Sequence, residues 1–127
     1  MTTTLIQSDE PICRYFLGSR KLNRSAAKRS WLPDAQGRTS VYRVHGLGHG
    51  EIEDIGRVHV AQPRGKVLSG RTECQSVNLT NVGLDIIPDP EPHPRHANVT
   101  GWPEDKSEQL DVIAEFAQHL SLYPIGG

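Results

Sequence analysis

The densest group of side chains able to bind ligands or move protons lies in residues 93–102, in the run HPRHANVTGW. It combines two histidines, an arginine, an amide and an indole within ten residues. Histidine ionises near neutral pH and is therefore suited to general acid–base catalysis. A catalytic site in this chain is expected to centre on His96, with Arg95 or Arg43 stabilising an anion and Tyr42 assisting. The substrate class that fits these groups is RNA or a nucleotide.

The same segment has two other interpretations. An exposed loop carrying His93, Asn98 and Trp102 can recognise a protein partner. In the purely structural interpretation, His96 is a hydrogen-bonded residue at the start of a strand and Trp102 packs the last helix against the core. The structural interpretation is preferred, because spacing identifies no catalytic partner for His96.

No cofactor or metal is predicted. His93 and His96, even with Asp89 or Glu91 added, match no closed zinc pattern. The two cysteines lie far apart, at positions 13 and 74, and no G-x-S-x-G turn occurs. Residues 44–51 are rich in glycine but lack the G-x-G-x-x-G spacing, and the acidic residues that follow would repel a phosphate.

The net charge of −1 conceals an uneven distribution of charge. Residues 1–50 hold eight Lys or Arg against three acids, whereas residues 76–127 hold two against eight. The basic half offers a patch for weak, salt-sensitive nucleic-acid binding through residues 14–43. Its cations are Arg14, Arg20, Lys21, Arg24, Lys28 and Arg29. A solvated surface and self-association between oppositely charged faces are the alternatives.

Periodicity and turn signals predict a series of short elements. Strands are expected at residues 13–17, 58–61, 84–87 and 96–100, and a hairpin at 31–44. Residues 18–30 are predicted to form a loop or a weak helix, and residues 51–56 a short helix. A Thr-x-x-Gln capping box at Thr72 and Gln75 predicts a helix over 72–82, ended by Gly83, and a proline-rich loop follows at 88–94.

An amphipathic helix is predicted from Pro103 onward. Proline fits the first turn of a helix, and the acidic residues that follow favour the positive end of its dipole. The expected buried face consists of Leu110, Ile113, Ala114, Ala117 and Leu120.

Together these elements predict an α+β domain, with a small, mainly antiparallel sheet packed by two to three helices. Residues 1–11 are expected to fray and 12–123 to form one compact unit. The leading functional hypothesis is a small intracellular, bacterial accessory or interaction module that binds a protein partner, with homo-oligomers as an alternative. It rests on the lack of a complete catalytic motif. No apolar run is long enough to cross a bilayer, so a cytoplasmic location is expected.

Overall fold

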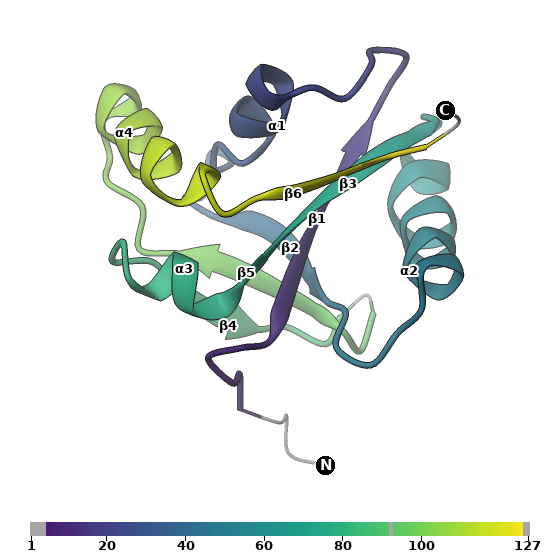
Figure 1. The fold of residues 1–127 in the computed structure, drawn as a ribbon, viewed down its shortest axis with the longest axis horizontal. Helices are drawn as coiled ribbons and strands as arrows, with labels where there is room; N and C mark the ends of the chain where they lie inside the picture. Colours follow the sequence, from purple (N-terminus) through teal and green to yellow (C-terminus); the bar gives the residue numbers. More distant parts are fainter. Residues whose placement is uncertain (1–4, 92, 126–127) are drawn as a thin grey trace.

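A computed structural model describes residues 5–91 and 93–125 of the chain. Their six strands form one sheet in the order β4-β5-β2-β1-β3-β6, and every neighbouring pair is antiparallel (Figure 1). The predicted α+β class with an antiparallel sheet is therefore confirmed. The strands are β1 Pro11–Leu17, β2 Thr39–Arg43, β3 Leu68–Gln75, β4 Asp85–Pro88, β5 His96–Thr100 and β6 Ser121–Pro124.

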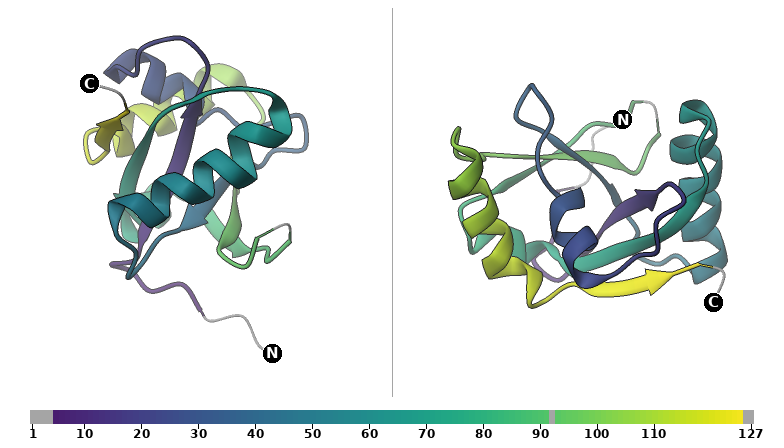
Figure 2. Two further views of the ribbon diagram at one scale, coloured as in Figure 1. Left: turned by 90° about the vertical axis from the view of Figure 1, so that its right-hand side faces the viewer. Right: turned by 90° about the horizontal axis from the view of Figure 1, so that it is seen from above.

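Helices cover both faces of this sheet (Figure 2). One face carries α1 Arg24–Ser30, α3 Ser76–Thr80 and α4 Lys106–Ala117. The opposite face carries a single helical segment that runs through α2 His49–Ile55, the π-helical η1 Gly56–Ala61 and the 3-10 turn η2 Gln62–Arg64. Side chains alternate across the strands, so each face has its own apolar cluster. Trp31, Val41 and Phe116 lie in the first cluster, and Tyr15 and Tyr42 in the second.

The hairpin predicted at residues 31–44 is wrong in its first half. Asn23 caps α1 by accepting a hydrogen bond of 2.8 Å from the Ala26 amide, and Trp31 ends that helix rather than starting a strand. The indole is fully buried, and its Nε1 donates to the Thr72 hydroxyl over 2.9 Å. Burial of this large side chain fixes the helix end against the sheet. The second half of the prediction, the strand at Thr39–Arg43, is confirmed.

The strand predicted at residues 58–61 is also wrong, because the helix that starts at His49 continues through this stretch. Gly56 allows the helix to approach β1 closely. The Tyr15 hydroxyl donates to the Ile52 carbonyl over 2.5 Å, and the Tyr15 ring lies where a Cβ at Gly56 would stand, 2.5 Å from its nearest carbon. A β-branched run thus becomes helical because this contact secures the helix over the sheet.

Substitution of Gly56 by alanine is expected to destabilise the protein by about 1–3 kcal/mol, because the added methyl group overlaps the Tyr15 ring. The matched control is Gly50→Ala in α2, where a Cβ meets nothing within 4 Å. That substitution should stabilise the helix by about 0.5–1 kcal/mol. Urea unfolding of both variants measures the difference. Equal stability of the two would contradict the packing described here.

The helix predicted over residues 72–82 is shorter than expected. Residues up to Gln75 belong to β3, and only Ser76–Thr80 is helical. The Thr72 hydroxyl accepts from the Trp31 indole instead of capping a helix, and β3 is held between β1 and β6. Pairing on both edges of β3 outweighs the local capping signal. Gly83 does end the turn after α3 with a φ of +89°, and the strand predicted at 84–87 forms as β4.

The carboxyl-terminal helix is confirmed, with two differences. It begins at Lys106, because Asp105 acts as the N-cap and accepts from the Ser107 amide over 3.2 Å. Phe116 is buried, whereas Ala114, predicted to face the core, is exposed. The Trp102 ring packs against Phe116, with the ring centres 6.4 Å apart. Strand β6, which follows this helix, is not in the sequence prediction.

Residues 7–11 lie against the start of α3. The Ser76 amide donates to the Glu10 carbonyl over 2.8 Å, and the Val77 amide donates to the Ser8 carbonyl over 2.9 Å. Of the segment predicted to fray, residues 1–4 fall outside the described part of the chain. The cysteines Cys13 and Cys74 are both free and buried, and they belong to the clusters on opposite faces of the sheet.

Candidate functional site

A serine, a histidine and an aspartate lie in a hydrogen-bonded row on the sheet. Strand β2 pairs with β5 so that Tyr42 lies opposite His96 and Ser40 opposite Asn98. The Ser40 Oγ is 2.7 Å from His96 Nε2. On the other side of the ring, His96 Nδ1 is 3.0 Å from the Asp89 carbonyl oxygen and 3.6 Å from its carboxylate Oδ2. A carbonyl oxygen can only accept, which places the ring proton on Nδ1, so Nε2 is free to accept from the Ser40 hydroxyl.

The hairpin between β4 and β5 positions the aspartate. The Asp89 amide donates to the His96 carbonyl over 2.9 Å, directly after β4 ends at Pro88. Asn98, predicted as a binding residue, donates from Nδ2 to Asp89 Oδ2 over 3.1 Å. Both the backbone and the carboxylate of Asp89 are therefore held in place beside the imidazole.

Aromatic rings enclose the histidine. His96 is buried, and its ring centre lies 5.3 Å from that of Tyr42. Tyr42 also contacts the rings of Tyr15 at 5.4 Å and His93 at 5.8 Å. Burial raises the pKa of Tyr42, although nearby Arg64 acts in the opposite direction. Burial, together with nearby His59, Arg95 and His96, lowers the pKa of His93. Both side chains are consequently neutral at pH 7.

A cavity of about 270 Å³ opens beside this row, and we call it the β1–β2 cavity. It exists because the two strands diverge: β1 pairs with β2 only through Ile12 and Cys13. Ser40 lies in its wall, whereas His96 lies behind Ser40. The lining residues are Arg14, Tyr15, Phe16, Leu17, Ser30, Ser40, Tyr42, Val60, Arg64 and Lys66.

Arg14 bridges the gap between the diverging strands. Its Nε donates to the Ser30 carbonyl over 2.9 Å and its Nη1 to the Ser40 carbonyl over 2.8 Å. No hydrogen bond to the remaining nitrogen, Nη2, is found among the described residues. In that part of the chain every fully buried polar side-chain atom has a partner. Nη2 is therefore not fully buried, and Arg14 is one of the residues that line the cavity.

Two further cations come from the end of the helix on the opposite side of the cavity. The Arg64 Nη1 donates to the Val60 carbonyl over 3.0 Å. Gly65, with a φ of +61°, turns the chain back, and the Lys66 amide then donates to the Ala61 carbonyl over 3.0 Å. This left-handed turn favours glycine and places both cations at the rim of the β1–β2 cavity.

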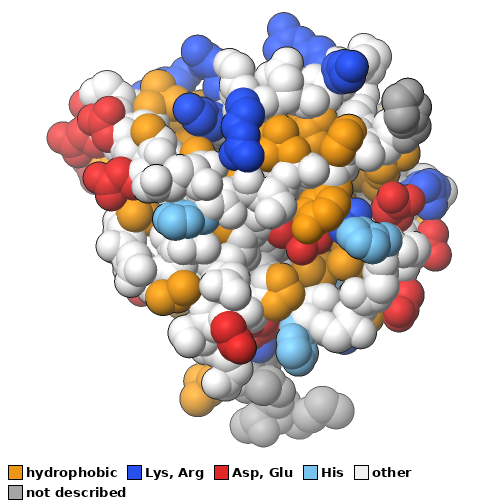
Figure 3. All heavy atoms as spheres, in the orientation of Figure 1, with side chains coloured by type: hydrophobic (Ala, Val, Ile, Leu, Met, Phe, Trp, Pro, Cys, Tyr) orange, Lys and Arg blue, Asp and Glu red, His pale blue; other side chains and the backbone are white. Residues whose placement is uncertain are grey.

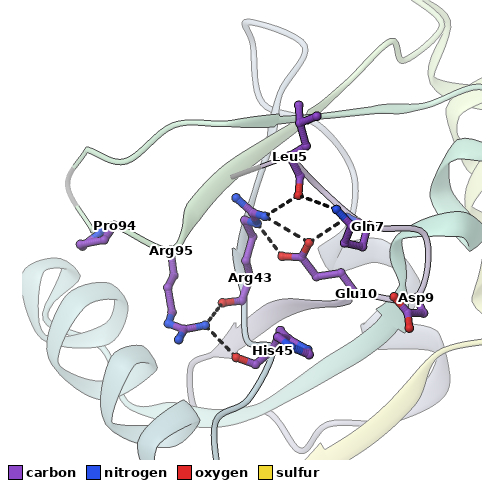
Figure 4. Close-up of a pocket in the computed structure, with 8 residues that line it drawn as sticks. All are labelled: Leu5, Gln7, Asp9, Glu10, Arg43, His45, Pro94 and Arg95. Atoms are coloured by element: carbon purple, nitrogen blue, oxygen red, sulfur yellow. Dashed lines mark hydrogen bonds and ion pairs between the residues drawn. The ribbon is translucent and has the colours of Figure 1, made fainter. Parts of the chain in front are cut away.

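Arg43 and Arg95 line a different cavity, of about 420 Å³, near the amino terminus (Figure 4). Arg43 Nε donates to the buried carboxylate of Glu10 over 2.5 Å. Arg95 Nη1 donates to the backbone carbonyls of Arg43, over 3.1 Å, and of His45, over 3.0 Å. Both guanidinium groups thus tie segments of backbone together. Of the four predicted catalytic residues, the structure brings Tyr42 and His96 together and places the two arginines elsewhere.

The basic residues predicted to bind nucleic acid lie on and before α1. Arg20, Lys21, Arg24, Lys28 and Arg29 are all exposed. Figure 3 shows Lys and Arg side chains along the top of the molecule, over α1, and acidic side chains at the left, over α4. The two oppositely charged regions meet where Arg24 Nη1 donates to the Ala117 carbonyl over 3.0 Å.

Sequence reasoning did not identify Ser40 as a partner of His96, nor Arg64 and Lys66 as neighbours of Ser40. The one available signal is that Ser40 and Tyr42 alternate on one face of a predicted strand. Which residue lies opposite them depends on strand register, which the sequence does not specify.

Comparisons with protein-family models, curated proteins and solved structures find no match to this chain. In the described residues, no helix is long and apolar enough to cross a membrane. Within the same residues, no group of three or more His, Cys, Asp or Glu side chains is arranged to hold a metal ion.

Proposed function

We propose that this protein is a small enzyme that hydrolyses phosphate esters of a nucleotide type, with Ser40 as the nucleophile and His96 as its general base. The observation that carries the proposal is the 2.7 Å contact between Ser40 Oγ and His96 Nε2, with Nδ1 held by Asp89. A serine hydroxyl is a weak nucleophile unless a positioned base removes its proton. The cations of the β1–β2 cavity supply the charge that phosphoryl transfer requires.

The first half of the reaction forms a phosphoserine. Ser40 Oγ attacks the phosphorus atom and forms the new O–P bond, while its proton passes to His96 Nε2. The bond between phosphorus and the leaving oxygen breaks on the side opposite Ser40, and that oxygen takes a proton from solvent, while His96 keeps the serine proton. Asp89 accepts from Nδ1 and stabilises the imidazolium that exists between the two proton transfers.

The second half releases phosphate and restores the serine. Water attacks the phosphorus atom on the side opposite Ser40 and gives one proton to solvent. The bond to Ser40 breaks, and the serine oxygen recovers the proton from His96. Throughout, Arg14 and Arg64 lie beside the oxygens on which negative charge develops.

A fluorophosphonate reagent tests the nucleophile directly, because such reagents label activated serines and leave ordinary ones unmodified. We expect one covalent adduct, located on Ser40 by mass spectrometry of the digested protein. Ser40→Ala should abolish the label. Ser121→Ala, which alters an exposed serine of β6, should leave it unchanged.

An unlabelled wild-type protein would overturn the proposal, as would equal labelling of Ser40→Ala. The interaction module predicted from the sequence remains the other hypothesis. It requires a partner but no turnover, so absence of the Ser40 adduct together with partner capture would favour it.

A further inference from the structure

We propose that the β1–β2 cavity binds the terminal phosphate of a phosphate monoester and discriminates against the internal phosphate of a diester. The identity of the reacting group rests on the proposed function. Binding itself depends on Arg14, Arg64 and Lys66 and does not require Ser40 to react. A site of this kind would bind a nucleotide through its terminal phosphate and would exclude RNA, whose internal phosphates are diesters.

The charge of the β1–β2 cavity favours a terminal phosphate. The cavity is lined by three cationic side chains, and no carboxylate is among the described residues that line it. A terminal phosphate carries close to two negative charges at neutral pH, whereas a diester carries one. The nearest acidic group on the α1 side, Asp34, pairs with Arg38 at 3.9 Å and caps its own turn. The excess positive charge of the cavity thus favours the dianion.

The charge of Arg14 is not neutralised by a hydrogen bond to a carboxylate in the described residues. Two of its nitrogens donate to backbone carbonyls, Nη2 has no hydrogen-bond partner among the described residues, and Arg14 lines the cavity. Burial, with nearby Arg64 acting in the same direction, lowers the pKa of Arg14 to about 10. In the described residues no hydrogen bond joins this partly buried guanidinium to a carboxylate, so a phosphate in the cavity would supply its anionic partner. Fixed at two nitrogens, the guanidinium also loses little freedom on binding.

The size and shape of the β1–β2 cavity also suit a small phosphate monoester. A volume of about 270 Å³ lies just below the range of about 300–1,000 Å³ that is usual for sites of drug-sized molecules, and so suits a smaller ligand. It accommodates a phosphate and a small organic group, for which the Tyr15–Leu17 stretch of β1 provides an apolar wall. Val60 and the helix that carries it bound the cavity on the opposite side. A nucleic-acid strand instead needs an open groove that follows its backbone in both directions.

Isothermal titration with inorganic phosphate, compared with dimethyl phosphate as the diester probe, tests the inference. We expect phosphate to bind at least about tenfold more tightly than dimethyl phosphate. The double variant Arg64→Gln with Lys66→Gln should weaken phosphate binding about a hundredfold, since each charged hydrogen bond contributes about tenfold or more. Both side chains are exposed, so this variant should fold, as circular dichroism can verify.

The matched control removes the same charge elsewhere, by Arg57→Gln with Lys106→Gln, two exposed cations outside the cavity. Its affinity for phosphate should stay within about threefold of wild type, the residual effect of long-range charge. Equal losses in the two double variants would overturn the inference, since binding would then follow net charge. Equal affinity for phosphate and dimethyl phosphate would overturn it too.

The Ser40→Ala variant separates this inference from the proposed function. It should keep phosphate affinity within about threefold of wild type, because an alanine at this position removes no charge. Phosphate binding without a fluorophosphonate adduct on Ser40 would support the binding site and overturn the proposed nucleophile. An adduct on Ser40 without phosphate binding would support the nucleophile and overturn the monoester site.

Discussion

Substitution of Ser40 by alanine is expected to reduce hydrolysis of p-nitrophenyl phosphate at least about a thousandfold, because it removes the atom that bonds to phosphorus. The loss should appear in kcat, since the cations that bind phosphate are unchanged. The free energy of unfolding should change by only about 1 kcal/mol, the value of one hydrogen bond at a partly exposed site. Steady-state kinetics and urea unfolding measure the two effects separately.

The Asp89→Asn variant is expected to lose less activity than Ser40→Ala. His96 Nδ1 lies closer to the Asp89 carbonyl oxygen, at 3.0 Å, than to the carboxylate, at 3.6 Å. The substitution keeps the backbone acceptor and removes only the charge, so the loss of activity should be about tenfold, well below that of Ser40→Ala. Comparable losses in both variants would mean that the carboxylate, rather than the carbonyl, holds the imidazole. Wild-type activity in Ser40→Ala would contradict the nucleophile.

The strands that carry the serine and the histidine were predictable, but their contact was not. Thr, Val and Tyr in β2, and the alternation in β5, are local signals that survive in the fold. The pairing of Tyr42 with His96 is a tertiary property, because neither turn chemistry nor periodicity relates residues 54 positions apart. The sequence prediction therefore included His96 but not Ser40, the side chain that its ring contacts.

The incorrect predictions of secondary structure have a related cause. Thr72 and Gln75 have the form of a capping box, but β3 gains a partner strand on each edge, and Thr72 accepts a buried hydrogen bond. Residues 58–61 contain two valines, yet they are helical because Gly56 allows close packing on Tyr15. In both places contacts distant in sequence override a local preference of a few tenths of a kcal/mol per residue.

The sequence also does not show that the three cations of the β1–β2 cavity lie together. Arg64 and Lys66 flank Gly65 in the sequence, and in the structure Gly65 forms a left-handed turn between them. It does not indicate which strand the turn faces. Arg14 was grouped with the basic patch by proximity in sequence, whereas its side chain passes between β1 and β2 into the β1–β2 cavity.

The protein is expected to lose stability steeply above pH 9 because both thiols are buried in the folded state. Burial raises the pKa of Cys74 from 9.0 to about 12, and burial with nearby Glu73 raises the pKa of Cys13 further. Above pH 9 the unfolded chain therefore releases two protons that the folded chain retains. Between pH 9 and 10 the free energy of unfolding should fall by about 1 kcal/mol for each thiol, or about 2 kcal/mol in all, and the slope for each thiol approaches about 1.4 kcal/mol per pH unit at higher pH. Below about pH 8 both states hold these protons, and the thiols contribute no slope.

The thiols dominate the interval from pH 9 to 10. The raised pKa values of Tyr15 and Tyr42 cause most of their loss above pH 10, the unfolded value of tyrosine, whereas Arg14, whose pKa is lowered to about 10, opposes it in that same higher range. Cys74→Ala should halve the slope of unfolding free energy against pH, whatever constant offset the smaller side chain introduces. Urea unfolding under reducing conditions, at several pH values from 7 to 10, gives both slopes. Parallel curves for wild type and Cys74→Ala would show that the Cys74 thiol ionises equally in the folded and unfolded states, contrary to its burial beneath α4.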